Sequence, residues 1–414
     1  MKDEEMRLSA REVEIGMYVT RLNKPWLETP FMLQGFAINS KEDLALLIDN
    51  CNYCYVDIHR SKPFKPTQLQ GQEEEQKASN FRITSSKPAK RRRKIYKDST
   101  EMTDELKDIR KNHTTMSGVI KDMVTSLKFT KKLDLVEAKA AIKPMVESII
   151  RNPDALLWLS RLRQLDDYNY SHSLGCSIWS MAMGRQLGMN RIDIEALGLG
   201  GLLFDIGKTR IPDKILSKKE LLTEKEIDVI KKHVQHSMDI ISTEKGINFK
   251  IKNMVESHHE RIDGSGYPHG IIGSQIPLFG KIAAIVDCYD AITSVRGYAQ
   301  PLSSQEAVKK LYEWRGTEFQ AELVEEFIQA IGMFPAGSLV ELTTGEVAVV
   351  VTESRTRRLR PKIMLLLDAN KEPREDYIIC NLMHETHNSD GQKLDIKCAL
   401  PTGSFGIRAD DYFL

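Results

Sequence analysis

The chain has 414 residues, more than one ordinary hydrophobic core holds, so we expect two or three domains. Its 41% hydrophobic and 28% charged residues are typical of a folded globular protein, which excludes fibrous and disordered classes. The 59 Lys and Arg balance 58 Asp and Glu, so no overall charge steers the protein to nucleic acid or a membrane surface.

The sequence offers no segment for crossing or entering a membrane. No apolar run approaches the roughly 20 residues that span a bilayer, and the N-terminal "MKDEEMRLSAREVEIG" lacks the apolar stretch of a signal peptide. We therefore expect a cytoplasmic protein without a membrane partner.

Residues 1–62 are predicted to form a small α/β domain. The alternation in "EVEIGMYVTRL" indicates a strand, Ser40 is a candidate N-cap for a helix over "KEDLALLIDN", and "YCYVDI" indicates a second strand. Cys51 and Cys54 form a CxxC without a second pair, so we expect them to pack in the core rather than bind metal.

Residues 63–100 are predicted to be a flexible, partly basic linker, because few apolar side chains are available to offset the entropy of ordering. Seven basic residues and no acid lie between Lys87 and Lys97. Such a run can attract phosphate groups, but it lacks interleaved aromatic residues, so we expect no nucleic-acid partner.

Residues 101–333 have apolar residues at helical spacing, as in "LDLVEAKAAIKPMVESII" and "LVEEFIQAI". Residues 334–414 change to short strands, namely "SLVELTTGEVAVVVTES", "PKIMLLLDA" and "YIICNL". The predicted fold is therefore multidomain and mainly α, with a helical bundle between the small α/β domain and a short β-rich module.

Candidate metal ligands gather in the helical region, where six of the ten histidines lie between 172 and 269. His258 and His259 are adjacent, Asp205 ends an apolar helix, and Asp287 lies inside "GKIAAIVDCYDAITS". Widely spaced ligands of this kind suit a site inside a helical bundle. Mixed imidazole and carboxylate ligands favour iron, manganese or another transition metal.

Two further features suggest phosphate chemistry. Asp205 and Lys208 are three residues apart, so a carboxylate on a metal would stand beside an ammonium that neutralises a phosphate. The "GSGYP" stretch is predicted to be a loop, in which two glycines and Pro268 shape a pocket wall.

Residues 168–300 resemble an HD-GYP domain, a metal-dependent phosphodiesterase class that acts on cyclic di-GMP. The resemblance rests on "YNYSHS", "DIGKTRIPDKIL", "IKKHVQHS", "HHERIDGSGYPHGIIGSQIP" and "IVDCYDAITSVRGY". The front unit is similar to a domain of unassigned role that often precedes HD-GYP domains. Together the two resemblances cover more than half of the chain.

The resemblance implies a helical HD-type bundle with two divalent metals, Fe or Mn, and a water between them as the nucleophile. Asp205 would bridge the metals, and Asp205 and Lys208 would be the catalytic residues. Arg296 would hold the phosphate, and the loop residues Gly266, Tyr267, Pro268 and Arg261 would line the substrate site and a surface for signalling partners. The implied metal ligands are His172, Asp205, His233, His258, His259 and Asp287.

The sequence departs from the family at Phe204, where a metal-binding histidine is expected, and at Ala299, where a basic residue is common. The phenylalanine leaves one metal with His172 and two carboxylates, so we expect that position to be weak. His236 belongs to the side that is already complete, and His269 is expected at the pocket rim.

Two functions stay open, and a homodimer is also left open. The chain is either an enzyme that hydrolyses cyclic di-GMP to pGpG or GMP in bacterial second-messenger signalling, or a non-catalytic protein that binds a cyclic dinucleotide or a signalling partner. The enzyme is favoured by the retained Asp205, Lys208, His258-His259, Asp287 and GYP loop, whereas Phe204 and Ala299 favour the binding protein.

Overall fold

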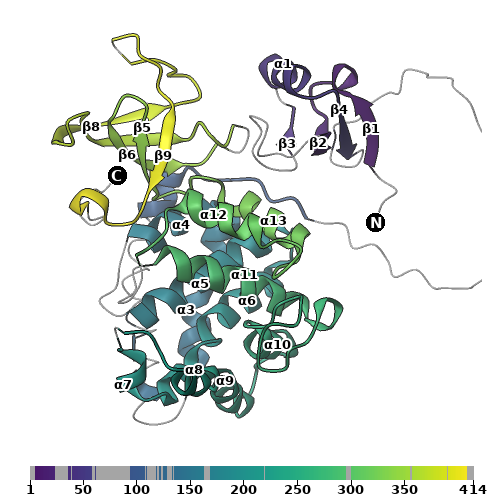
Figure 1. The fold of residues 1–414 in the computed structure, drawn as a ribbon, viewed down its shortest axis with the longest axis vertical. Helices are drawn as coiled ribbons and strands as arrows, with labels where there is room; N and C mark the ends of the chain where they lie inside the picture. Colours follow the sequence, from purple (N-terminus) through teal and green to yellow (C-terminus); the bar gives the residue numbers. More distant parts are fainter. Residues whose placement is uncertain are drawn as a thin grey trace, which may run out of the picture. The chain divides into compact units, whose positions relative to one another are not determined.

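The computed structural model divides the chain into two compact units, residues 1–93 and 94–414 (Figure 1). It describes residues 5–23, 36–38, 40–57, 61, 94–107, 109, 118, 121–122, 125–127, 133, 135–162, 168–218, 220–294, 300–354, 357–388 and 390–407. Of the predicted linker, 63–100, residues 63–93 lie outside the described residues. Residues 94–100 contact the helical unit, because Lys94 N donates to Gly188 O and the Tyr96 hydroxyl donates to Met189 O.

The first unit contains an antiparallel sheet in the order β1 (Glu5–Ser9), β4 (Tyr53–Asp57), β2 (Tyr18–Leu22), β3 (Phe36–Ala37). Helix α1 (Lys41–Asn50) begins after Ser40, whose side chain accepts from Asp43 N while the Asp43 carboxylate accepts from Ser40 N. This capping box confirms the predicted helix start. Cys51 and Cys54 are buried in the core of this unit.

The strand predicted over "EVEIGMYVTRL" is shorter than the alternation suggests. A 3-10 turn, η1 (Ala10–Glu12), precedes it, and Gly16 has a φ of 101°. A left-handed glycine interrupts an extended chain, so the strand begins only at Tyr18.

The helical part of the second unit surrounds three central helices, α5 (Tyr168–Gln186), α6 (Arg191–Leu203) and α11 (Leu278–Thr293). Their apolar residues face neighbours on several sides, and nine of the thirteen residues of α6 are buried. The surrounding elements are α3 (Leu135–Arg151), α4 (Pro153–Leu162), η3 (Ile206–Arg210), α7 (Asp213–Leu216), α8 (Glu224–Lys231), α9 (His233–Ser242), α10 (Phe249–Ser257), η4 (Gly273–Gln275), α12 (Ser304–Glu313) and α13 (Ala321–Ile331). The mainly α fold with a small α/β unit is confirmed.

The C-terminal part is a five-stranded antiparallel sheet in the order β8 (Pro373–Asn381), β7 (Lys362–Leu367), β6 (Val347–Thr352), β5 (Leu339–Leu342), β9 (Ile396–Leu400), followed by η5 (Ser404–Gly406). The β-rich module predicted here is confirmed, although β9 was not predicted because it has little apolar alternation. Hydrogen bonds join the module to the helices: Ala399 N donates to the Gln305 side chain and Glu353 N donates to Asp154.

Within the described residues, no helix combines the length and the apolar character needed to cross a membrane.

Candidate metal centre

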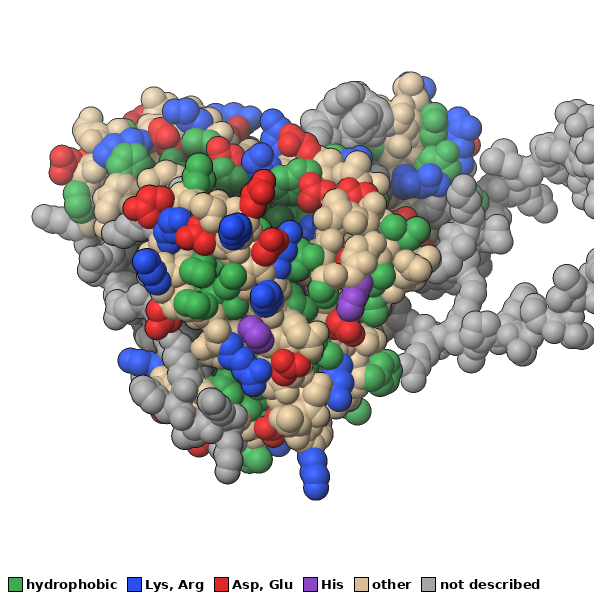
Figure 2. Space-filling model, turned by 60° about the horizontal axis from the view of Figure 1, so that its bottom comes forward, with side chains coloured by type: hydrophobic (Ala, Val, Ile, Leu, Met, Phe, Trp, Pro, Cys, Tyr) green, Lys and Arg blue, Asp and Glu red, His purple; other side chains and the backbone are tan. Residues whose placement is uncertain are grey.

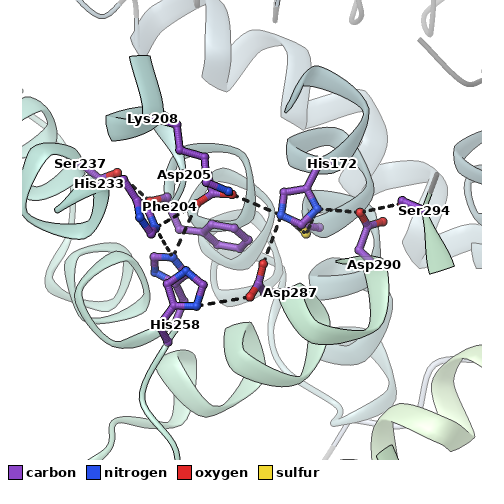
Figure 3. Close-up of polar contacts among 12 residues, drawn as sticks. His172, Phe204, Asp205, Lys208, His233, Ser237, His258, Asp287, Asp290 and Ser294 are labelled. Atoms are coloured by element: carbon purple, nitrogen blue, oxygen red, sulfur yellow. Dashed lines mark hydrogen bonds and ion pairs between the residues drawn. The ribbon is translucent and has the colours of Figure 1, made fainter. Parts of the chain in front are cut away.

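The six predicted ligands come together although they are far apart in the sequence (Figure 3). They are supplied by α5, by the turn after α6, by the start of α9, by the residues after α10 and by α11. In that order they are His172, Asp205, His233, His258 with His259, and Asp287. The ligand atoms form two groups that share Asp205.

The first group contains Asp205 and the three histidines His233, His258 and His259, whose ligand atoms all lie within 4.8 Å of one another. Asp205 Oδ1 is 3.2 Å from His233 Nε2 and 3.7 Å from His258 Nε2. The two Nε2 atoms are 3.2 Å apart. Three nitrogens and one oxygen are a suitable set for a divalent transition metal.

Hydrogen bonds at the far side of the rings fix which nitrogens carry lone pairs. His233 Nδ1 donates to Ile230 O and His258 Nδ1 donates to Val255 O, each at 2.7 Å. Neutral rings so bonded direct Nε2 lone pairs at Asp205 Oδ1, which is buried and has no hydrogen-bond partner in the described structure. Acceptors that face one another need a cation between them, so this group fits a metal ion.

The second group contains His172, Asp205 and Asp287. His172 Nε2 is 3.2 Å from Asp205 Oδ2 and 3.1 Å from Asp287 Oδ1. Asp205 therefore turns one oxygen to each group, which is the arrangement expected of a carboxylate that bridges two cations. Asp287 Oδ2 is also 3.5 Å from His259 Nδ1, which links the two groups on the opposite side.

Phe204 lies between the two groups, as Figure 3 shows. Its side chain is fully buried, with its ring stacked on His258 at a centroid distance of 4.6 Å and edge-on to His172 at 6.2 Å. A phenyl ring has no lone pair and excludes water from the volume it fills. The second group thus keeps three protein ligands, and no water can enter where the ring stands.

The main chain around Phe204 is held independently of its side chain. Phe204 is the C-cap of α6, and the Ser237 hydroxyl donates to Phe204 O while accepting from Gly207 N. Gly207 lacks room for a side chain, since a Cβ there would lie 2.1 Å from His233 O. This close approach places Asp205 opposite His233 of α9.

Charge and burial set the protonation of the ligands. Burial raises the pKa of Asp205, but the Lys208 ammonium, with Nζ 2.5 Å from Oδ2, holds that pKa well below its usual range. Burial lowers the pKa values of His258 and His259. A charged carboxylate and neutral imidazoles are the forms that bind metals.

The GYP loop forms one side of the site. The Tyr267 ring stacks on His259 at 4.5 Å, and burial raises the pKa of its phenol, so the hydroxyl keeps its proton. Buried Glu260 anchors the loop by accepting from His269 N and Ile271 N. Gly266 is required because a Cβ would lie 2.4 Å from Arg261 N.

The predicted substrate residues are less well defined by the structure. Arg261 contacts Glu318, with Nε 3.7 Å from Oε2, and stands over the Phe319 ring, so its role in substrate binding stays a prediction. Arg296 and Ala299 lie outside the described residues. Pro268 follows Tyr267 through a cis peptide bond, and His269 pairs with Glu256 at the surface.

One residue of the centre was missed by the sequence reasoning. Asp290 Oδ2 is 2.7 Å from His172 Nδ1, on the ring edge opposite the ligand atom. The signal was present, because Asp290 follows Asp287 by three residues on the same predicted helix and lies in the same apolar stretch.

The face of the second unit that Figure 2 shows carries no large patch of like charges. On the face seen in Figure 2, basic and acidic side chains are interspersed with apolar ones. Attraction for an anionic ligand must therefore come from the site itself, where Lys208 is the nearest cationic side chain to the bridging Asp205.

Comparisons with known proteins agree with this architecture. Residues 145–323 match the HD domain family, residues 5–138 match a domain of unknown function (DUF3391), and residues 339–389 match the KOW domain associated with HD domain. With its GYP signature at residues 266–268, the chain belongs to the HD-GYP family of HD-domain proteins.

Similar proteins include three curated relatives. The chain is 29% identical over 371 residues to the cyclic di-GMP phosphodiesterase PA4108 of Pseudomonas aeruginosa, covering 88% of this chain and 86% of that protein. It is 32% identical to a cyclic di-GMP phosphodiesterase of Thermotoga maritima, covering 42% of this chain and 48% of that protein. It is 30% identical to the 3'3'-cGAMP-specific phosphodiesterase 2 of Vibrio cholerae, covering 38% of this chain and 31% of that protein.

Among solved structures, the chain is similar to Bd1817, an HDG"Y"P protein from Bdellovibrio bacteriovorus, with 15% identity and a TM-score of 0.45. That alignment covers 78% of this chain and 98% of the other.

Proposed function

We propose that this chain is a cyclic dinucleotide phosphodiesterase of the HD-GYP type, which hydrolyses cyclic di-GMP to pGpG or GMP in bacterial second-messenger signalling. The observation that carries the proposal is Asp205, a buried carboxylate that presents one oxygen to each of two ligand groups. The curated relatives named for cyclic di-GMP and 3'3'-cGAMP hydrolysis support the same substrate class.

The first group would hold one divalent metal through His233, His258, His259 and Asp205, and the second would hold another through His172, Asp287 and Asp205. Iron or manganese is the proposed metal, because the ligands are imidazoles and carboxylates. When bound, the two metals supply an activated water and positive charge at the phosphorus. Phe204 weakens the second position by removing one ligand.

The chain's own residues would orient the substrate. Lys208 stands beside Asp205 with its ammonium partly exposed, so it can pair with a phosphate oxygen. The Tyr267 ring stacks on the His259 ring and keeps it in place. Arg296 is proposed to make a second phosphate contact, and the GYP loop a docking surface for signalling partners.

The test compares the unmodified protein with Phe204→His, both loaded with Mn²⁺ or Fe²⁺ without oxygen. We expect the unmodified protein to convert cyclic di-GMP slowly with fewer than two metals per chain. Phe204→His should bind close to two metals and turn over at least about 10-fold faster, because a fully occupied second position stabilises the charge that develops at the phosphorus. Chromatography of pGpG and GMP and metal analysis give the two readouts.

Phe204→Leu is the matched control, because it removes the ring without adding a lone pair. If Leu and His raise turnover equally, the ring acts by filling space rather than by displacing a ligand. The alternative function is a non-catalytic binding protein, favoured by the buried phenyl ring between the ligand groups. Binding of cyclic di-GMP by the unmodified protein without turnover in either metal would establish that alternative.

A further inference from the structure

We infer that Asp290 is a positioning residue, which holds His172 in the orientation that directs Nε2 at Asp205 and Asp287. The inference rests on the proposed function, because it assigns a role within the second ligand group. It concerns a side chain that binds no metal itself and acts only through the imidazole.

Hydrogen bonds from residues other than His172 also hold the Asp290 side chain in place. This side chain is 9% exposed on α11, and Trp179 Nε1 donates to Oδ1 at 3.0 Å. Ser294 Oγ donates to Oδ2 at 3.3 Å, and His172 Nδ1 donates to the same oxygen at 2.7 Å (Figure 3). With donors on both oxygens, the carboxylate has a single orientation, and it imposes that orientation on the imidazole.

Helix α5 leaves space for this carboxylate. Gly175 follows His172 by three residues, and a Cβ there would lie 2.3 Å from Asp290 Oδ1. The chain at this point can approach α11 only because position 175 has no side chain. Gly175, Trp179 and His172 thus form one face of α5 that receives Asp290.

The histidine ligands differ in the groups that accept the hydrogen bonds from their Nδ1 atoms. His233 and His258 donate to backbone carbonyls, whereas His172 donates to a carboxylate. A negative acceptor makes the imidazole a stronger metal ligand than a neutral carbonyl does. The group containing His172 is also the one that Phe204 deprives of a ligand, so its metal depends most on how well His172 is held.

Asp290 could instead ligate a metal itself, since its carboxylate, His172 and Cys176 also lie within 4.8 Å of one another. Two observations oppose this role. Both Asp290 oxygens already accept hydrogen bonds, and Cys176 Sγ is 3.7 Å from both ring nitrogens of His172, deep in the helical core. The contacts of Asp290 are therefore those of a residue that supports the His172 imidazole.

The experiment measures Mn²⁺ binding by chelator competition in the full chain and in Asp290→Asn, which keeps the size of the side chain and removes its charge. We expect the affinity of the second metal to fall about 10- to 100-fold, as for other outer partners of metal-binding histidines, while the first metal is unchanged. Asp154→Asn is the matched control, because Asp154 is also a buried aspartate but lies on α4, which supplies none of the ligands.

Gly175→Ala provides a second route to the same result, which matters if Asp290→Asn folds poorly. Alanine favours the helix, so α5 itself is not weakened. Its Cβ displaces the Asp290 carboxylate without altering any titratable group. The second metal should therefore be lost as in Asp290→Asn.

A metal-free readout separates this inference from the proposed function. In protein labelled with ¹⁵N-histidine, the proton on His172 Nδ1 should give a downfield, slowly exchanging resonance. The resonance should move or vanish in Asp290→Asn and Gly175→Ala and persist in Asp154→Asn.

Persistence of the resonance in Asp290→Asn, or an unchanged affinity for the second metal, overturns the positioning role while leaving the proposed function intact. If the unmodified protein binds one metal only, the two-metal part of the proposed function fails. The Nδ1 resonance then still decides whether Asp290 holds His172.

Discussion

Asp205 remains charged in a place where burial alone would neutralise it. Burial raises its pKa, but the charge of Lys208 reverses the effect and brings the pKa well below the usual range. The balance leaves an anionic oxygen without a hydrogen-bond partner at Oδ1. A buried anionic oxygen of this kind is suited to bind a cation. Without a bound cation it lowers the stability of the fold.

The same balance of burial and pairing operates at Glu105, away from the site. Burial raises the pKa of Glu105, but the hydrogen bonds and charge of Arg151 lower it below its usual value overall. Arg151 donates through Nε at 2.8 Å and through Nη2 at 2.6 Å. This pair joins the helical residues 102–107 to α3.

We predict that Glu105→Gln lowers the free energy of unfolding at pH 7 by about 2 kcal/mol, since a hydrogen-bonded charge is lost from a buried position. A depressed folded pKa contributes stability that is present above the unfolded pKa and lost as pH falls through the folded value. The difference between the two proteins should therefore shrink below pH 4.5. Urea denaturation at pH 7 and pH 4 measures it, with exposed Glu101→Gln as control. An equal difference at both pH values contradicts the prediction.

At the scale of elements, the site depends on how closely η3 approaches α9. Gly207 is the point of contact, where a Cβ would lie 2.1 Å from His233 O and 2.4 Å from Ser237 N. Both of these are backbone atoms, which cannot rotate away. Asp205 and Lys208 flank Gly207 on the same turn, so a shift of η3 moves the bridging carboxylate and the phosphate-binding ammonium together.

We predict that Gly207→Ala lowers stability by about 1–3 kcal/mol through overpacking and also lowers the number of metals bound per chain. Thermal unfolding and metal analysis measure the two effects. Gly273→Ala is the control, because the nearest atom to its added Cβ is 3.8 Å away. Full metal content in Gly207→Ala would show that η3 can move without disturbing the ligands.

The sequence predicted those elements in which local pattern and tertiary packing agree. Helix α1 has both its cap and its periodicity in the sequence, and α3 keeps an amphipathic pattern despite Pro144. Strand β9 was missed because its residues show little apolar alternation. Only its backbone pairing with β5 identifies it as a strand. The late start of the strand, at Tyr18, reflects a turn at Gly16 that alternation alone does not reveal.

At the scale of the whole molecule, every predicted metal ligand belongs to residues 94–414, and the first unit has a hydrophobic core of its own. The clustering of the six candidate ligands could be predicted by resemblance, since each of them matches a position of the family's motifs. The asymmetry between the two groups could be predicted only in part, because the position of the Phe204 ring and the Asp290 support depend on packing among α5, α6 and α11.

We predict that a shortened chain of residues 94–414 binds as many metal ions as the full chain, because its core and its ligands are complete without residues 1–93. Metal analysis and thermal unfolding of the two chains test this. A lower metal content in the shortened chain, with an intact unfolding transition, would mean that the first unit contributes to the site.

The Ser237 hydroxyl holds the carbonyl of Phe204 and the amide of Gly207 at once. The path of the main chain at position 204 is thereby secured whatever side chain stands there. A lineage that replaced histidine with phenylalanine would keep the turn intact, and restoring histidine would need no second change in that turn. The difference between a full and a depleted site thus remains reversible by selection at a single codon.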